Sequence, residues 1–232
     1  MDNAIDPFSD NPDPALYVPR DATERALAAL LDCVRAPGRH ALLLAPPGTG
    51  KTLLLHLLET RLPAGLGAVY VPNPVLDPSE LSAWTLGRLG SPRFPDPDGV
   101  LRAYAAHRAE CGGALVWLID DADLLPAATA RWLLDAVARA EGGLRLVLTA
   151  THDQSEGLAV FDGLVHIDSL ARPMQAAEIA QYVFERLYRA RGSDALRARL
   201  AAALEAIGEV SGGIPRAVNT ACQGLAERPS LP

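Results

Sequence analysis

Residues 45–52 read Ala-Pro-Pro-Gly-Thr-Gly-Lys-Thr, and their types and spacing suit the binding of a nucleotide phosphate. In such a glycine-rich turn, successive backbone N–H groups form a concave nest for phosphate oxygens. Lys51 is expected to reach the β- and γ-phosphates, and the Thr52 hydroxyl is expected to bind Mg²⁺. The predicted phosphate-binding residues are Pro46, Pro47, Gly48, Thr49, Gly50, Lys51 and Thr52.

Lysine usage strengthens this interpretation of the turn. The chain has twenty arginines and a single lysine, and that lysine is Lys51. A compact ammonium on a flexible stem is not interchangeable with a planar guanidinium at a phosphate site. One position departs from the general pattern, because Ala45 stands where glycine is usual. We expect binding to persist with a local change in the turn.

Residues 115–121, Leu-Val-Trp-Leu-Ile-Asp-Asp, resemble a Walker B element. An apolar strand there would deliver a carboxylate to the edge where open α/β sheets bind ligands. Asp120 is expected to hold Mg²⁺. The next position is usually glutamate in hydrolysing proteins, where it activates the attacking water, and here it is the shorter Asp121. Three outcomes stay open for Asp121: it acts as the base, it acts slowly, or it does not act.

Three further positions are candidates for contact with a nucleotide. Thr151 follows the strand beside the Walker B strand and is the first choice for the γ-phosphate, with His152 second; both would equally suit a simple strand end. Arg216, in Ser-Gly-Gly-Ile-Pro-Arg, falls in the first turn of a predicted helix, where it either pairs with the γ-phosphate or faces solvent. Tyr17 either lines a base pocket or anchors the N-terminal segment. The sequence therefore leaves open whether the nucleotide base is adenine or guanine.

Elements that would position these residues alternate between strand and helix. Apolar runs predict strands at 40–44, 68–71, 114–119, 144–148 and 164–167. Helical spacing predicts helices from about residue 21, with Asp21 as N-cap and Glu24 completing a capping box, and from residues 53, 78, 100 and 127. Strands that alternate with helices imply a parallel sheet between helices. Residues 91–99, rich in proline, are expected to form a surface loop.

The pattern changes after residue 170. Helices are predicted at 176–191, 194–210 and 215–226 with no strand between them. We therefore expect an irregular N-terminal segment at 1–19, an α/β domain at 20–170 and a small all-helical domain at 171–232.

The totals limit the class of protein. Of 232 residues, 49% are hydrophobic, enough for a sizeable core, and a net charge of −7 argues against a dedicated nucleic-acid binder. Three widely spaced cysteines indicate free thiols in a reducing compartment. No apolar run approaches the ~18 residues of a membrane span, and the acidic N-terminus lacks the features of a signal peptide. These features predict a soluble, cytoplasmic protein.

Together, these motifs resemble those of AAA+ P-loop ATPases, and more closely those of the general secretion pathway protein A family, the ATPases of type II secretion and pilus systems. Residues 8–17, Phe-Ser-Asp-Asn-Pro-Asp-Pro-Ala-Leu-Tyr, resemble the opening of that family, and residues 178–192 resemble its lid motif. The resemblance implies a five-stranded parallel sheet with a helical lid, ATP and Mg²⁺ as ligands, and Arg216 as the sensor-2 arginine. It also implies a secretion or pilus-assembly protein as partner, and a homo- or hetero-oligomer.

Two departures, Asp121 in place of glutamate and a missing arginine, leave the function open between alternatives. AAA+ ATPases usually carry an arginine before the fifth strand that completes a neighbour's site, and this chain has none between Arg145 and Arg172. An arginine finger is worth about 10³–10⁵ in rate. The chain is therefore an ATPase that drives a partner's conformational change, or a nucleotide-dependent binding module with negligible turnover.

A third alternative is a DNA-associated ATPase like the transposition regulators. It depends on a cluster of lid arginines that would meet phosphates. A solvated helical face explains the same cluster and suits the acidic total better. The arginines are Arg186, Arg189, Arg191, Arg197 and Arg199.

Overall fold

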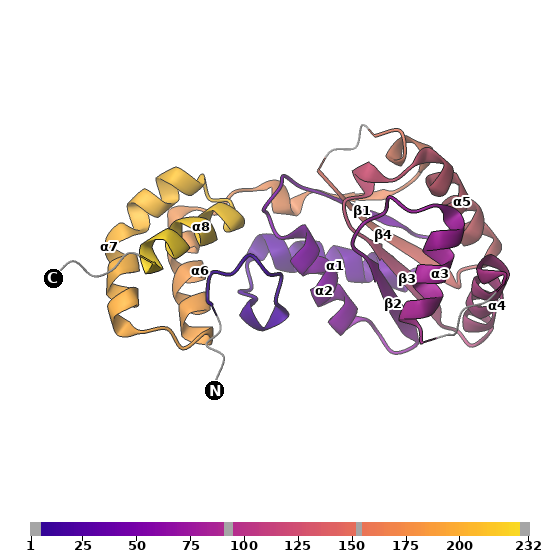
Figure 1. Ribbon diagram of the computed structural model, residues 1–232, viewed down its shortest axis with the longest axis horizontal. Helices are drawn as coiled ribbons and strands as arrows, with labels where there is room; N and C mark the ends of the chain where they lie inside the picture. Colours follow the sequence, from indigo (N-terminus) through magenta and orange to yellow (C-terminus); the bar gives the residue numbers. More distant parts are fainter. Residues whose placement is uncertain (1–5, 91–94, 152–154, 228–232) are drawn as a thin grey trace.

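The computed structural model describes residues 6–90, 95–151 and 155–227. Its α/β part is built on a parallel five-stranded sheet in the order β2-β3-β4-β1-β5, which confirms the predicted fold (Figure 1). The strands are β1 (Ala41–Leu44), β2 (Leu66–Val71), β3 (Ala114–Ile119), β4 (Leu144–Ala150) and β5 (Val165–Ile167). Because β4 lies between β3 and β1 and all three strands are parallel, the polar residues that follow them meet at one edge of the sheet.

Alternation along the central strands builds two apolar layers. On β3, Trp117 packs among α3 (Pro78–Arg88), α4 (Pro97–Glu110) and α5 (Ala127–Arg139). Its neighbour Leu118 faces the other layer, with α1 (Asp21–Arg35) and α2 (Lys51–Arg61). All six residues of β3 are buried, as expected for a central parallel strand covered by helices on both faces.

Three helices form a second, smaller unit with its own apolar core: α6 (Ala176–Arg189), α7 (Asp194–Ser211) and α8 (Pro215–Ala226). In Figure 1 this lid stands beside the α/β part, joined to it through the short helix η4 (Ser169–Ala171). The remaining short helices are η1 (Pro14–Leu16), η2 (Ala122–Leu124) and η3 (Leu158–Val160). In the described part of the chain, no helix is both long and apolar enough to cross a bilayer.

The N-terminal segment, residues 6–18, belongs to the core of the lid despite its place in the sequence. Phe8 is fully buried and Val18 is 3% exposed, and both pack among the residues of α6, α7 and α8. Figure 1 shows the segment passing between the lid and the α1–α2 side of the sheet. The segment therefore links the two parts of the molecule.

Two sequence predictions of helix starts were wrong. Asp21 is the first residue of α1 and not its N-cap; the Thr23 hydroxyl accepts from the N–H of Arg20, while Glu24 accepts from the phenol of Tyr17 at 2.6 Å. The second error is at α4, which begins at Pro97, inside the predicted loop, because the Asp96 carboxylate caps it by accepting from the N–H of Gly99. The capping box of Asp77 and Glu80 at α3 is present.

Candidate functional site

The turn at residues 45–50 joins β1 to α2 and has the backbone that a phosphate nest requires. Gly48 (φ +78°) and Gly50 (φ +102°) both adopt left-handed conformations, which glycine tolerates without steric cost. Gly50 is the N-cap of α2, so the positive end of the helix dipole points out of the turn. The hydroxyl of Thr49 donates to the carbonyl of Pro46 at 2.8 Å and holds the loop closed.

Ala45 lies at the end of β1 rather than in the bend. Its N–H donates to the carbonyl of Ala150 at 3.2 Å, and its side chain is 2% exposed. Ala45 has no positive φ. Glycine is therefore not required at this position, which explains the departure from the usual pattern.

Lys51 occupies the first turn of α2 and is 7% exposed. Its Nζ donates to the carbonyl of Ala45 at 2.8 Å and lies 3.4 Å from the Thr151 hydroxyl. Burial lowers the pKa of Lys51, and the nearby Asp121 and Asp120 oppose that shift. The structure thus places Lys51 and Thr151, which are 100 residues apart in sequence, at the same point.

Asp120 directly follows β3, and its carboxylate accepts three hydrogen bonds from side-chain hydroxyls. Its Oδ2 accepts from the hydroxyl of Thr52 at 2.6 Å and from that of Tyr70 at 3.0 Å. Its Oδ1 accepts from the hydroxyl of Thr149. Asp120 is only 3% exposed, and these three hydroxyl donors satisfy the hydrogen-bonding needs of its buried oxygens. The contact between Asp120 and Thr52 brings together the two oxygens predicted to hold Mg²⁺, and oxygen donors are those that this ion prefers.

Asp121 is exposed and its backbone is left-handed, with φ +47°. Its N–H donates to the hydroxyl of Thr149 at 3.2 Å, which fixes the turn after β3. Aspartate is among the residues enriched in this region of φ/ψ space, which gives a local reason for aspartate at this position. Its carboxylate is nevertheless partly desolvated by the surrounding residues, and this desolvation, together with the neighbouring Asp120, raises the pKa of Asp121; Lys51 partly offsets that rise.

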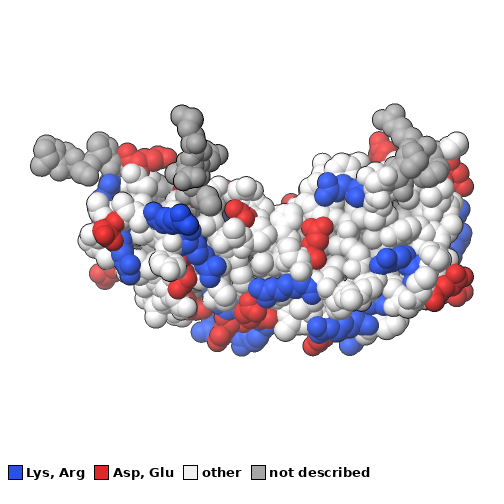
Figure 2. Space-filling view, turned by 90° about the horizontal axis from the view of Figure 1, so that it is seen from below, with Lys and Arg blue, Asp and Glu red and all other residues white. Residues whose placement is uncertain are grey.

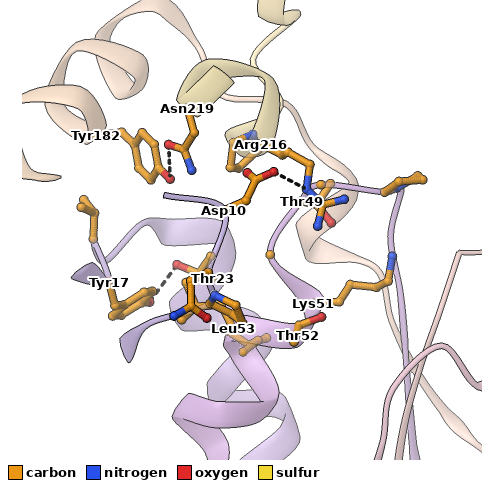
Figure 3. A pocket seen from close by; sticks show the side chains of 18 of the residues that line it. Asp10, Tyr17, Thr23, Thr49, Lys51, Thr52, Leu53, Tyr182, Arg216 and Asn219 are labelled. Carbon is orange, nitrogen blue, oxygen red and sulfur yellow. Dashed lines mark hydrogen bonds and ion pairs between the residues drawn. The ribbon is translucent and has the colours of Figure 1, made fainter. Parts of the chain in front are cut away.

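Arg216 reaches the site from the lid. Its backbone N–H, in the first turn of α8, donates to the carbonyl of Gly48 at 3.0 Å. Its guanidinium Nε lies 3.9 Å from the carboxylate of Asp10, and both side chains are largely exposed (Figure 3). The lid therefore contacts the phosphate turn directly, and the N-terminal segment reaches Arg216 through Asp10.

One cavity of about 400 Å³ joins these groups. The phosphate turn, Lys51 and Thr52 line one side, together with Asp121, Thr151 and Arg216. Tyr17 lines the opposite side; its phenol bonds to Glu24 and Thr23, and Arg61 covers its ring. Burial and Glu24 raise the pKa of Tyr17 to about 12, so the phenol stays neutral. Of the predicted site residues, only Asp120 and Pro46 are not part of this lining, and both contact residues that are.

Several residues of the site were not chosen from the sequence as nucleotide ligands. Tyr70 and Thr149 hold Asp120, while Asp10, Tyr182, Arg186 and Asn219 line the cavity from the N-terminal segment and the lid. Tyr70 is the last but one residue of β2, beside β3, and a polar residue so close to the strand end was a signal that could have found it. His152, the second choice to Thr151, lies outside the described residues.

The arginine cluster predicted for DNA is not a single exposed face. Arg186 is 4% exposed and donates to the carbonyls of Pro7 and Ser9. Arg189 pairs with Glu185, and Arg197 lies over the ring of Phe184. On the face seen in Figure 2, basic and acidic side chains are interspersed. The cluster as proposed from sequence is therefore wrong in at least one member.

Solved structures share this architecture at low sequence identity. Cdc6p from Pyrobaculum aerophilum is 19% identical, with a TM-score of 0.58, over 95% of this chain and 66% of that one. The ORC2 protein of Aeropyrum pernix, solved as ADPNP-ADP complexes, is 16% identical with a TM-score of 0.62 (97% and 66%). A RuvB variant from Thermotoga maritima is 18% identical with a TM-score of 0.51 (89% and 61%). The chain thus spans about two thirds or less of the length of each.

No curated protein matches the sequence. A sequence model described as an AAA domain matches residues 35–158, more than half of the chain. That range contains the phosphate turn, both Walker B aspartates and Thr151. The chain belongs to the AAA domain family of P-loop proteins.

Proposed function

We propose that the protein binds Mg-ATP in the cavity between its α/β part and its lid and hydrolyses it slowly to ADP and phosphate. The observation that carries this proposal is the convergence of Lys51, Thr52 and Asp120 beside a turn with two left-handed glycines. The structure of the ORC2 protein with ADPNP and ADP, which is similar over 97% of this chain, supports a nucleotide as the ligand.

Each residue has a proposed role. The backbone of the turn and Lys51 bind the β- and γ-phosphates, and Thr52 with Asp120 would hold Mg²⁺, which neutralises phosphate charge when bound. Asp121 accepts a proton from the attacking water. The oxygen of that water bonds to the γ-phosphorus, and ADP leaves. Thr151 and Arg216 contact the γ-phosphate. The raised pKa of Asp121 improves it as a base, but its shorter side chain places the carboxylate less favourably.

Slow turnover follows from two features. Asp121 is one methylene shorter than the usual glutamate, and a misplacement of about 1 Å can reduce a rate ~100-fold. No arginine lies between Arg145 and Arg172, so within a homo-oligomer that region supplies none to a neighbour. We propose that a partner protein activates turnover. The resemblance in sequence to the type II secretion ATPases suggests a secretion or pilus-assembly protein in the cytoplasm.

The direct test is ATP binding and steady-state turnover by the purified protein, with Lys51→Ala as the inactive variant. Arg35→Ala is the matched control, because it removes one cation from an exposed ion pair far from the cavity. We expect ATP to raise the melting temperature of the wild type and of Arg35→Ala but not of Lys51→Ala. Equal ATP affinity in all three proteins would contradict nucleotide binding at this site.

A nucleotide-dependent binding module is the second candidate, and the contact between α8 and the turn favours it. Since the N–H of Arg216 bonds to Gly48, a ligand that orders the turn also orders the lid. Tight ATP binding without turnover, unchanged by Asp121→Glu, would establish this alternative. Nucleic acid remains the less favoured partner, because Arg186 is buried.

A further inference from the structure

Three buried polar side chains form a connected row at the side of the cavity opposite Lys51. Arg186 and Tyr182 come from α6 and Asn219 comes from α8, and their exposed fractions are 4%, 7% and 6%. All three line the cavity. Figure 3 shows Tyr182 and Asn219 in contact, across the pocket from Lys51 and Thr52. Buried polar groups of this kind are normally fully hydrogen-bonded, so each bond of the row can be followed.

The chemistry of the three groups fixes the direction of each bond. A guanidinium can only donate, so the phenol oxygen of Tyr182 must accept from Nη1 of Arg186 at 3.1 Å. The phenol hydrogen is then free to go to Oδ1 of Asn219, also at 3.1 Å. Burial raises the pKa of Tyr182 and keeps that hydrogen in place. The row therefore sets the orientation of the Asn219 amide, which is otherwise ambiguous between oxygen and nitrogen.

This orientation leaves the amide nitrogen of Asn219 as an unused donor. Among the described residues it has no hydrogen-bond acceptor, and it is not one of their fully buried unpaired polar atoms. It therefore keeps open surface, and the side chain lines the cavity. A donor that keeps open surface toward the cavity and has no partner in the protein is available to an acceptor placed there. A ligand in the cavity can supply that acceptor.

The row is held from outside by the N-terminal segment. Nε of Arg186 donates to the carbonyl of Pro7 at 2.5 Å, and Nη2 donates to that of Ser9 at 3.3 Å. Phe8, between these two carbonyls, is fully buried in the lid core. The guanidinium also lies over the Tyr182 ring, 5.5 Å from its centroid. Arg186 is thus constrained on both sides, and it constrains Tyr182 and Asn219 in turn.

We propose that Asn219 is a specificity-determining residue that donates from Nδ2 to a ring nitrogen or oxygen acceptor of the nucleotide base, with Tyr182 and Arg186 as positioning residues. This inference rests on the proposed function. The triphosphate is assigned to the side of the cavity that holds Lys51 and Thr52, so the base extends toward Tyr17 and Asn219. A heterocyclic base offers hydrogen-bond acceptors in its ring plane. A triphosphate alone, bound at Lys51 and Thr52, offers no acceptor to Asn219 on the other side of the cavity.

The experiment compares equilibrium binding of ATP with that of inorganic tripolyphosphate, which carries the same kind of phosphate chain without a base. We expect Asn219→Leu to weaken ATP binding at least tenfold while tripolyphosphate binding stays within twofold. Asn219→Asp provides a second variant, since it keeps the acceptor for Tyr182 and removes only the donor. Its added charge acts on both polyanions, so the ratio of the two affinities remains the readout, and we expect that ratio to fall.

Tyr182→Phe tests the positioning role. Without the phenol, the amide of Asn219 is free to turn, and we expect the ratio of ATP to tripolyphosphate affinity to fall about two- to fivefold. Tyr188→Phe, on the same helix and 78% exposed, is the control and should leave the ratio unchanged. A loss of stability alone would lower both affinities and leave the ratio constant.

The outcomes separate this inference from the proposed function. If the wild type binds ATP and neither Asn219 variant changes the affinity ratio, Asn219 does not contact the base and the inference is overturned. If the wild type binds tripolyphosphate and ATP equally well, no residue contacts the base, which also overturns it while leaving the phosphate site intact. If the wild type binds neither ligand, the proposed function itself is overturned.

Discussion

The backbone N–H of Arg216 donates to the carbonyl of Gly48 at 3.0 Å, so the first turn of α8 rests on the phosphate turn. The contact is close at the side chain too, because a Cβ added to Gly48 would lie 2.8 Å from Cβ of Arg216. The lid is therefore in direct contact with the loop that would hold phosphate. A conformational change in that loop would therefore act directly on α8 and the lid.

Gly48→Ala should weaken both the lid contact and nucleotide binding. The left-handed backbone at φ +78° costs about 1–2 kcal/mol for alanine, and the close Arg216 adds a steric clash. Gly38→Ala is the matched control, because Gly38 has φ +73° with nothing within 4 Å. Thermal melts should show a larger loss for Gly48→Ala, and ATP titration should show a loss only there. Identical behaviour of the two variants would mean that the contact with α8 is unimportant.

ATP should protect Lys51 from amine-reactive reagents. Lys51 is the only lysine, so apart from the N-terminal amine it is the only primary amine in the chain. Its lowered pKa increases the fraction of neutral, reactive amine at a given pH. Peptide mass spectrometry after brief labelling should show less modification of Lys51 with ATP, and the N-terminal amine serves as the internal reference. Equal labelling of Lys51 with and without ATP would contradict its contact with phosphate.

Asp121→Glu should raise ATP turnover about tenfold, because it extends the carboxylate toward the attacking water. Asp121→Asn should reduce turnover strongly and preserve ATP binding. Both variants are compared with wild type by phosphate release and by ATP titration. Lower turnover in the glutamate variant would show that the left-handed backbone at this position requires aspartate.

The pH dependence of turnover tests the same residue. Burial and Asp120 raise the pKa of Asp121, and only its ionised form accepts a proton. Turnover should therefore be present above that raised pKa and be lost as the pH falls through it, at a higher pH than for an ordinary carboxylate near ~3.9. The residual turnover of Asp121→Asn should not show this loss as the pH falls.

Tyr70→Phe should raise the Mg²⁺ concentration needed for half-maximal nucleotide binding. The variant removes one of the two hydroxyls bonded to Oδ2 of Asp120 and leaves the aromatic contact of Tyr70 with His56. We expect a two- to fivefold increase in the Mg²⁺ requirement and a stability loss of about 1 kcal/mol. ATP titrations at a series of Mg²⁺ concentrations measure the effect, with the exposed Tyr188→Phe as control. An unchanged Mg²⁺ requirement would show that Tyr70 does not position Asp120.

Arg186→Met should release the N-terminal segment from the lid. The change removes three hydrogen bonds from a buried site, including those to the carbonyls of Pro7 and Ser9, and should cost about 2–4 kcal/mol. Limited proteolysis should then cut near residues 6–13 earlier than in wild type. Arg189→Met, which affects an exposed pair with Glu185, should change stability by less than about 0.5 kcal/mol. A resistant segment in Arg186→Met would show that Phe8 alone is sufficient to hold it.

The sequence was sufficient for the sheet and the phosphate turn because both depend on local order. The apolar strand is followed directly by the turn with Gly48 and Gly50 and then by the helix that begins at Lys51, and each element's preference agrees with its neighbours. The order of the strands then brought Asp120 beside Thr52, as the spacing of the two motifs predicted. Short-range errors occurred at element ends: Asp21 is not an N-cap, and the strand predicted at 68–71 begins at Leu66.

The tertiary structure alone decided how the site is completed. Arg186 lies 179 residues from Pro7 in the sequence, yet its side chain is buried and donates to the Pro7 carbonyl. When only its charge was considered, Arg186 had suggested a DNA-binding face. Tyr70 and Asn219 carry no motif, and only packing shows that one holds Asp120 and the other faces the cavity. The physical reason is that a side chain's partners depend on which distant segments the core brings together. Sequence periodicity determines the elements themselves, but it does not contain those partners.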